Sequence, residues 1–335
     1  MVKNLWLVWM VSSALIGWIV SPPPQLSVHF VDVGQGDCIL IQTPAGQSIL
    51  IDAGDRDQGP KVVQYLQNQG IEKIDLMVAT HPHADHIGGL IDVLNSFPVD
   101  LVLMPNATHT TKTFRDFQDA MIRDGIPTIT ARYGKGLELE GLEALCVAPV
   151  SEQYRNLNLY SAVIHMQYRH IAFLFTGDAE RESEEEMLEI AAPIESQVLK
   201  VGHHGSRTST SMDFAGEVNP KFAVIMCGEG NRYGHPHPET LETLRSLDAA
   251  IFRADQIGTI VMNTFGWGIR MRFPDRYPQW SSLQCTLSSL TPVVMQSRAI
   301  LHHLSLFGFR LLYGTIDEKI WVPNHFFLED KEGAD

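Results

Sequence analysis

The chain has 335 residues, of which 44% are hydrophobic, and its 39 acidic residues outnumber 25 basic ones, which gives a formal net charge of −14. Length and apolar content suit a globular protein of one large domain or two ordinary ones. The charge disfavours strong non-specific binding to nucleic acid, which needs Lys and Arg, but it leaves a nuclease open because bound cations add positive charge.

The N-terminus carries an almost uninterrupted apolar run from residue 5 to residue 20, with Lys3 before it and three prolines after it. This pattern resembles a signal peptide or a signal anchor. We expect residues 1–24 to be such a segment with a proline linker. Residues 5–20 would then anchor the protein in a membrane, or the protein would be secreted, with the soluble domain outside the cytoplasm. A buried N-terminal helix is the alternative.

Apolar runs separated by glycine and proline turns predict strands and helices in alternation up to about residue 275. We therefore expect one domain over residues 25–275 and a C-terminal extension of unknown role over residues 276–335. The predicted strands lie within 26–52, 74–79, 101–104, 126–150, 162–175, 197–201, 221–227 and 252–273, and the predicted helices span 61–69, 86–95, 112–124, 181–190 and 239–247.

The cysteines form no C-x-x-C pair, so neither a zinc ribbon nor a redox motif is present. Three of the four lie in apolar, strand-like runs, and we expect buried free thiols there. These three are Cys38, Cys146 and Cys227.

Residues 80–89 read Thr-His-Pro-His-Ala-Asp-His-Ile-Gly-Gly and connect a predicted strand to a predicted helix. His81 and His83, at positions i and i+2 of an extended segment, can grip one cation. Asp85 and His86, at the helix start, can face a second cation. Imidazole and carboxylate together suit zinc, manganese or iron.

Further polar groups follow other predicted strands. Asp178, reached through a glycine at the mouth of a buried strand, is placed to bridge two cations, although helix capping is an alternative. Asp32 and Asp37 flank a predicted tight turn, and they either belong to the functional site or only stabilise that turn. We expect the lone His109 to lie on the surface. The remaining candidates at strand ends are Asp52, Lys200, His203, His204, His235 and His237.

The segment Thr-His-Pro-His-Ala-Asp-His resembles the HxHxDH signature of the metallo-β-lactamase superfamily. Together with Asp-Val-Gly-Gln-Gly-Asp, Thr-Gly-Asp-Ala-Glu, Lys-Val-Gly-His-His-Gly-Ser and Tyr-Gly-His-Pro-His-Pro-Glu, in chain order, it is similar to the soluble ComEC-like competence domain over residues 26–273. The resemblance implies an α/β fold, the αββα four-layer metallo-β-lactamase sandwich. It also implies that Asp52 supports the metal loop by hydrogen bonding. A separate histidine usual in the superfamily is not evident, and Asn158 and Ser161 match the ComEC-like pattern there.

The resemblance implies metal-assisted hydrolysis with one or two divalent ions, zinc or manganese. His81, His83 and Asp178 would hold the first ion. The second would be held by Asp85, His86, Asp178 and His204. Asp85 would also orient the nucleophile. Candidate proton donors are His203, His235 and His237, and Lys200 either contacts a phosphate or is an exposed strand-end lysine.

The implied function is that of a phosphodiesterase or nuclease acting on DNA in competence or DNA uptake. A hydrolase of a small or envelope-linked phosphodiester is the first alternative, and a non-catalytic, metal-stabilised module of a transport assembly is the second. A basic groove beside the site would favour DNA, a narrow pocket would favour a small substrate, and a blocked metal face would favour the module.

Overall fold

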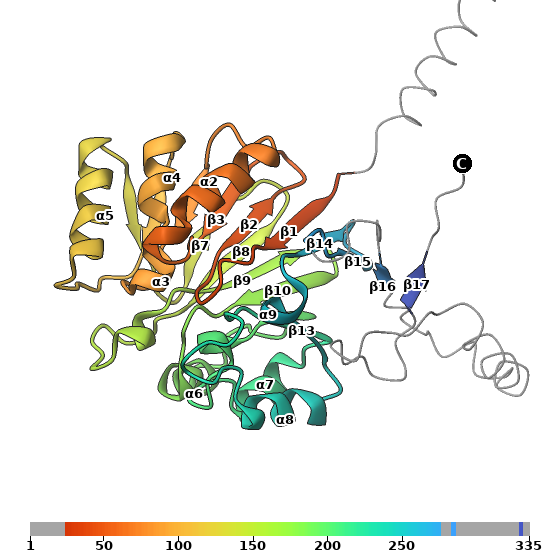
Figure 1. Cartoon of the computed structure of the whole chain (residues 1–335). Helices are drawn as coiled ribbons and strands as arrows, with labels where there is room; N and C mark the ends of the chain where they lie inside the picture. The colour runs from red at the N-terminus through yellow and green to blue at the C-terminus, as the bar shows by residue number, and fades with distance from the viewer. Residues whose placement is uncertain (1–23, 276–282, 286–327, 331–335) are drawn as a thin grey trace, which may run out of the picture.

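The computed structural model describes residues 24–275 and the strands Leu283–Cys285 and Leu328–Asp330 (Figure 1). The predicted anchor at residues 5–20 lies outside the described residues, as does most of the C-terminal extension. Within the described part, no helix combines the length and apolar character needed to cross a membrane.

Two mixed sheets form the centre of the fold. The ten strands of the first sheet are, in spatial order, β17 (Leu328–Asp330), β16 (Leu283–Cys285), β15 (Ile269–Arg272), β14 (Ile260–Thr264), β1 (Leu26–Phe30), β2 (Ile39–Gln42), β3 (Ser48–Ile51), β4 (Leu76–Val78), β5 (Val102–Met104) and β6 (Thr128–Thr130). The seven strands of the second are β13 (Ala250–Arg253), β12 (Phe222–Ile225), β11 (Val198–Lys200), β10 (Ile171–Phe175), β9 (Val163–Tyr168), β8 (Glu143–Ala148) and β7 (Lys135–Leu137).

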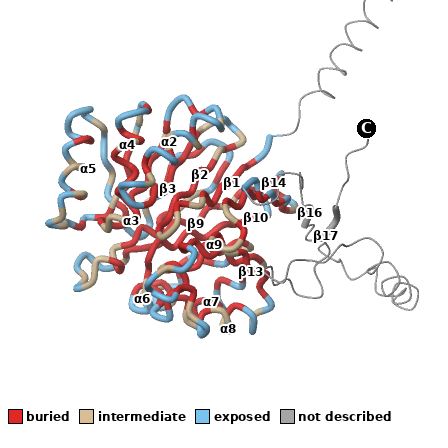
Figure 2. Tube along the Cα trace, in the orientation of Figure 1, coloured by how far each residue is buried: buried red, intermediate tan, exposed pale blue. Residues whose placement is uncertain are grey.

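Alternate side chains of the central strands enter different apolar layers. In β2, Ile39 and Ile41 join the core between the sheets, whereas Leu40 faces the outer helices. In β10, Phe173 lies between the sheets and Leu174 packs toward the helices on the opposite side. Strands buried on both faces read as continuous apolar runs, which is how the sequence predicts them. Figure 2 shows the buried strands at the centre of the molecule.

Helices cover the outer face of each sheet, as Figure 1 shows. The outer apolar layer of the first sheet includes Phe114 and Phe117 of α5, three positions apart on one helix face, and α5 begins at the N-cap Thr111. The predicted αββα sandwich is therefore confirmed. The helices are α2 (Gly59–Asn68), α4 (Leu90–Ser96) and α5 (Lys112–Arg123) on the first sheet, and α6 (Arg181–Glu189), α7 (Met212–Val218) and α8 (Pro238–Ser246) on the second.

The single helix predicted over residues 86–95 is instead two short helices, α3 (Ala84–Ile87) and α4. The helix is interrupted between them at Gly88 and Gly89. A Cβ atom at Gly89 would lie 2.1 Å from the Ala53 carbonyl oxygen, so only glycine lets the backbone pack this closely. The histidine-rich loop therefore packs closely against the segment that follows β3.

The parallel strands bring their carboxyl ends together. In the first sheet β3, β4, β5 and β6 run parallel, and in the second β10, β11, β12 and β13 do so. Loops that follow parallel strands meet at one edge of a sheet. The segments after β3, β4, β10, β11 and β12, which hold the predicted polar residues, consequently share one region of the molecule.

Candidate metal centre

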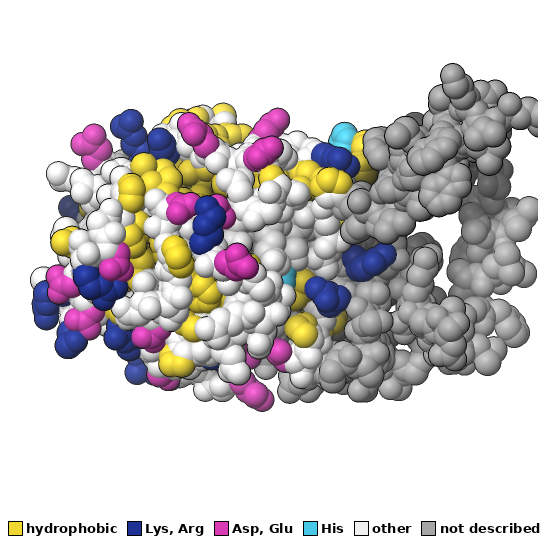
Figure 3. Space-filling model, turned by 90° about the horizontal axis from the view of Figure 1, so that it is seen from above, with side chains coloured by type: hydrophobic (Ala, Val, Ile, Leu, Met, Phe, Trp, Pro, Cys, Tyr) yellow, Lys and Arg dark blue, Asp and Glu magenta, His cyan; other side chains and the backbone are white. Residues whose placement is uncertain are grey.

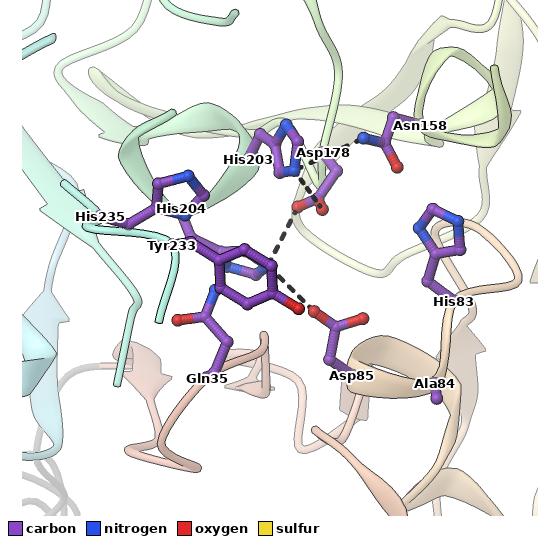
Figure 4. A pocket seen from close by; sticks show the side chains of 10 residues that line it. All are labelled: Gln35, His83, Ala84, Asp85, Asn158, Asp178, His203, His204, Tyr233 and His235. Atoms are coloured by element: carbon purple, nitrogen blue, oxygen red, sulfur yellow. Dashed lines mark hydrogen bonds and ion pairs between the residues drawn. The ribbon is translucent and has the colours of Figure 1, made fainter. Parts of the chain in front are cut away.

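Side chains from several of these loops surround one cavity of about 330 Å³ (Figure 4). The short helices beside it are η2 (Leu157–Tyr160) and η3 (Gly202–Gly205). The cavity is lined by Gln35, His83, Ala84, Asp85, Asn158, Asp178, His203, His204, Tyr233 and His235.

Four of the predicted ligands converge. His86 Nε2 lies 3.3 Å from Asp178 Oδ1, and His204 Nε2 lies 3.5 Å from the same oxygen. His204 Nε2 is also 3.5 Å from Asp85 Oδ2. Three of these atoms, His86 Nε2, His204 Nε2 and Asp178 Oδ1, are buried and have no hydrogen-bond partner. Leaving such an atom unpaired costs about 1–3 kcal/mol, so their convergence fits a divalent cation that would satisfy all three.

The other predicted set is less complete. His81, His86 and Asp178 offer ligand atoms within 4.8 Å of one another. His83 belongs to none of these groups, although its Nδ1 lies only 2.9 Å from His81 Nε2. His81 and His83 are thus adjacent, as predicted for two ligands of one cation, but only His81 approaches Asp178, at 3.8 Å.

Asp52 fixes the histidine-rich loop of residues 80–89 through hydrogen bonds. Its carboxylate accepts the Thr80 backbone N–H at 2.9 Å, the Thr80 hydroxyl at 2.6 Å and His86 Nδ1–H at 2.7 Å. Because a carboxylate only accepts, Nδ1 of His86 carries the proton and Nε2 presents a lone pair to the cluster. Asp52 does this with a left-handed backbone, φ 54°, a strained conformation typical of functional sites.

Ser161 contacts Asp178, and Asn158 contacts Glu180 two residues further along the chain. The Ser161 hydroxyl accepts the Asp178 backbone N–H at 3.0 Å and lies 3.5 Å from His81 Nδ1. The Asn158 amide donates to Glu180 Oε1 at 3.2 Å, while its buried Oδ1 has no partner. Asn158 therefore offers the site a neutral oxygen.

The two histidines of η3 differ in their roles. Both have left-handed backbones, with φ 45° at His203 and 56° at His204. His204 Nδ1–H donates to the Met226 carbonyl at 3.0 Å, which directs Nε2 at the ligand cluster. His203 is partly exposed, with Nδ1 3.0 Å from Glu180 Oε1 and Nε2 3.7 Å from Asp178 Oδ2.

The electrostatics of the cluster favour added positive charge. Burial alone would lower the pKa of His204, but the nearby carboxylates, Asp178 first and then Asp37 and Asp85, raise that pKa to about 9. Burial opposes charge on His86 too, yet Asp178 and Asp52 raise the pKa of His86 well above its usual range. The carboxylates thus stabilise cationic groups in their midst, which is what a divalent cation requires.

The prediction for Lys200 is wrong in both of its forms. Lys200 is fully buried, so it is neither an exposed strand-end lysine nor available to a phosphate. Its ammonium group forms an ion pair with Asp37 and donates to the Gly177 carbonyl at 2.8 Å. The other Asp37 oxygen lies 3.4 Å from His204 Nδ1, so this buried pair sits behind a predicted metal ligand.

Three other histidines differ from expectation. His237 does not line the cavity, and its Nδ1 accepts the Arg207 backbone N–H at 3.0 Å. His235 lines the cavity, but burial and the neighbouring His204 lower its pKa to about 4, so it is neutral near pH 7 and unsuited to donate a proton. His109 is half-buried, with its ring 5.9 Å from that of His83.

Sequence reasoning missed several residues of the site. Glu180 receives hydrogen bonds from Asn156 and Asn158, and it lies beside His203. Gln35 and Tyr233 line the cavity. All three residues lie within the motifs quoted above. Glutamine, tyrosine and a glutamate at a helix start have many ordinary roles, so the sequence alone does not mark them as site residues.

These features define the class of the protein. The model of the metallo-beta-lactamase superfamily matches residues 31–229, and the chain belongs to that superfamily, whose members are generally metal-dependent hydrolases. The His and Asp groups at the cavity are its candidate ligands for divalent metal.

Particular relatives sharpen this assignment. The chain is 31% identical over 250 residues to ComE operon protein 3 of Bacillus subtilis (strain 168), covering 70% of this chain and 32% of that protein. It is 30% identical over 247 residues to Recombination protein 2 of Haemophilus influenzae, covering 72% of this chain and 29% of that protein. It is also 28% identical over 253 residues to Competence protein ComA of Neisseria gonorrhoeae, covering 74% of this chain and 33% of that protein. The resemblance to competence proteins is thereby confirmed, and the chain spans about a third of the length of these relatives.

Among solved structures, a CmlA beta-hydroxylase mutant is similar with a TM-score of 0.50 and 13% identity, covering 73% of this chain and 55% of that chain. At this identity the likeness supports the fold alone.

Proposed function

We propose that the protein is a metal-dependent phosphodiesterase that cleaves DNA. The observation that carries the proposal is the convergence of buried, unpartnered ligand atoms from His86, Asp178 and His204 at an open cavity. A blocked metal face would have favoured a purely structural role, whereas this cavity admits a ligand.

Each residue has a role in this proposal. Bound zinc or manganese would supply an activated water and charge neutralisation at the phosphoryl oxygens. Asp85, partly exposed at the cavity, would orient the attacking water. His203, held by Glu180 through Nδ1, would donate a proton to the leaving oxygen from Nε2.

DNA is favoured over a small phosphodiester by the relatives, because Recombination protein 2 carries a name that indicates work on DNA. The small cavity supports the small or envelope-linked phosphodiester as second candidate. Action outside the cytoplasm is a further part of the proposal, and its support is the apolar run at residues 5–20.

The test uses the full chain, purified in mild detergent, loaded with zinc or manganese, with metal content measured by mass spectrometry. Wild type, Asp178→Ala and His83→Ala are assayed on single-stranded DNA, duplex DNA and bis(p-nitrophenyl) phosphate. His165→Ala is the matched control, because that imidazole lies outside the cavity and contacts the Glu195 carbonyl.

We expect wild type and His165→Ala to cleave DNA and the two site variants to lose activity. Cleavage of the small ester alone would move the second candidate to first place. Metal binding without cleavage of any substrate would refute the enzymatic proposal.

A further inference from the structure

A second, larger cavity of about 950 Å³ lies between the end of β6 and the segment after β8. We call it the tyrosine groove. It is lined by Asn106, Ile129, Thr130, Ala131, Arg132, Tyr133, Lys135, Pro149, Val150, Ser151, Glu152, Gln153, Tyr154 and Tyr160.

The groove borders the metal site. The short helix η2 separates the two cavities, with Asn158 lining the smaller one and Tyr160 lining the groove. The loop after β5 also serves both, because Asn106 lines the groove and His109 contacts the ring of His83. The two cavities are therefore neighbours, because they are lined by residues of the same short segments.

The charge of the groove is opposite in sign to the net charge of the protein. Two of its lining residues are basic, Arg132 and Lys135, and one is acidic, Glu152, in a chain whose acidic residues outnumber basic ones 39 to 25. Among the described residues, no ion pair involves Arg132 or Lys135. On the face drawn in Figure 3, by contrast, basic and acidic side chains are interspersed. This local excess of positive charge favours an anionic ligand.

The walls of the groove are fixed before any ligand binds. The Tyr133 N–H donates to the Pro149 carbonyl at 2.8 Å. The Tyr154 hydroxyl accepts the N–H groups of Val150 and Ser151 and donates to Glu186. Residue Tyr133 is 41% exposed, which leaves its side chain accessible to a stacking partner. A preorganised wall lowers the entropic cost of binding.

We propose that the tyrosine groove binds a single-stranded polynucleotide that continues from the phosphodiester held at the metal site. Exposed aromatic rings and unpaired cations are the combination that binds single strands, since rings stack on unpaired bases and cations contact phosphates. In a duplex the bases are paired and stacked on one another, which leaves none for Tyr133. The inference rests on the proposed function for its substrate class.

Binding is measured on the full chain in mild detergent with EDTA present, which prevents cleavage, by fluorescence anisotropy of a fluorescein-labelled oligodeoxythymidylate. The test variants are Arg132→Ala/Lys135→Ala and Tyr133→Ala. The matched control is Lys112→Ala/Arg123→Ala, which removes two exposed cations of α5 that do not line the groove. Cleavage of bis(p-nitrophenyl) phosphate by the metal-loaded variants is measured alongside.

We expect the double groove variant to bind at least about tenfold more weakly and to lower the slope of log Kd against log salt by about 1.4, the value for two phosphate contacts on a single strand. Tyr133→Ala should lose about five- to hundredfold. Cleavage of the small ester should stay unchanged in all variants, because the ester does not reach the groove.

Binding by the double groove variant equal to that of the control would overturn the inference. Equal affinity of the wild type for a duplex would overturn its single-strand part. These outcomes are distinguishable from failure of the proposed function, which would appear as absence of DNA cleavage by the metal-loaded wild type.

Discussion

Replacing Lys200 tests whether the buried pair behind His204 stabilises the fold. Lys200→Met keeps the length of the side chain but removes the ammonium group from Asp37 and from the Gly177 carbonyl. Both side chains of the pair are at most 2% exposed, so water cannot replace the lost contacts. Breaking a buried pair by removing one partner costs about 3–5 kcal/mol, a large part of the stability of a typical domain.

The second variant, Asp37→Asn/Lys200→Met, also removes the negative charge that Lys200→Met leaves buried and unpaired on Asp37. Because the neutral amide is less costly to bury, we expect it to recover most of the lost free energy of unfolding. Stability is measured by urea denaturation followed by circular dichroism. The difference in the free energy of unfolding between wild type and Lys200→Met should also become smaller as pH falls. The unpaired Asp37 carboxylate then takes up a proton and is no longer a buried charge.

The reasoning fails if Lys200→Met loses less than about 1 kcal/mol at pH 7.5. It also fails if the double variant is no more stable than the single one. Either result would mean that the carboxylate of Asp37 needs no cationic partner at this place.

Three further predictions concern pH and metal. Burial, with a smaller contribution from Arg272, lowers the pKa of His29 from 6.5 to about 4, so the stability it contributes is present above pH 6.5 and lost as pH falls toward 4. Between pH 7 and 4.5 we expect a loss of about 2 kcal/mol that is absent in His29→Gln, and parallel denaturation curves for both proteins would contradict this. Asp52→Asn should weaken zinc binding about 10- to 100-fold, because His86 loses its charged hydrogen-bond partner, and unchanged affinity in a chelator competition would exclude that role. Zinc at 100 times its Kd should raise the free energy of unfolding by about 2.7 kcal/mol, and EDTA should reverse the gain; a denaturation midpoint indifferent to both would mean that no folded-state metal site exists.

The sequence predicts the parts of this protein that depend on local pattern. Strands buried on both faces appear as apolar runs, and ligand residues cluster directly after them, so the strands and the residues around Asp178 follow from short segments. The four-layer arrangement needed the family resemblance. Asp52 and Ser161 needed the family resemblance, because a lone aspartate or serine has many possible roles. Their hydrogen bonds to His86 and Asp178 are visible only in the folded structure.

The incorrect predictions share a physical cause, which is tertiary contact between distant segments. Lysine is rarely buried without a partner, so Lys200 looks exposed until Asp37 is placed beside it. His235 and His237 have the same Pro-flanked pattern. Only the packing against the Arg207 backbone distinguishes His237, which turns away from the cavity, from His235, which lines it.

The two halves of the metal centre are unequal, and the inequality follows from the donors. Asp52 and the Met226 carbonyl fix the tautomers of His86 and His204, so these ligands meet Asp178 without rearrangement. On the other side His81 Nδ1 lies 3.2 Å from the Thr80 hydroxyl and 3.5 Å from the Ser161 hydroxyl, and because a hydroxyl can donate or accept, neither contact fixes the tautomer of His81. Asn158 adds only a neutral amide oxygen there, which is a weaker donor than an imidazole. The set of Asp85, His86, Asp178 and His204 should therefore bind metal first, and the set of His81, His83 and Asp178 should bind metal more weakly and exchange it more readily.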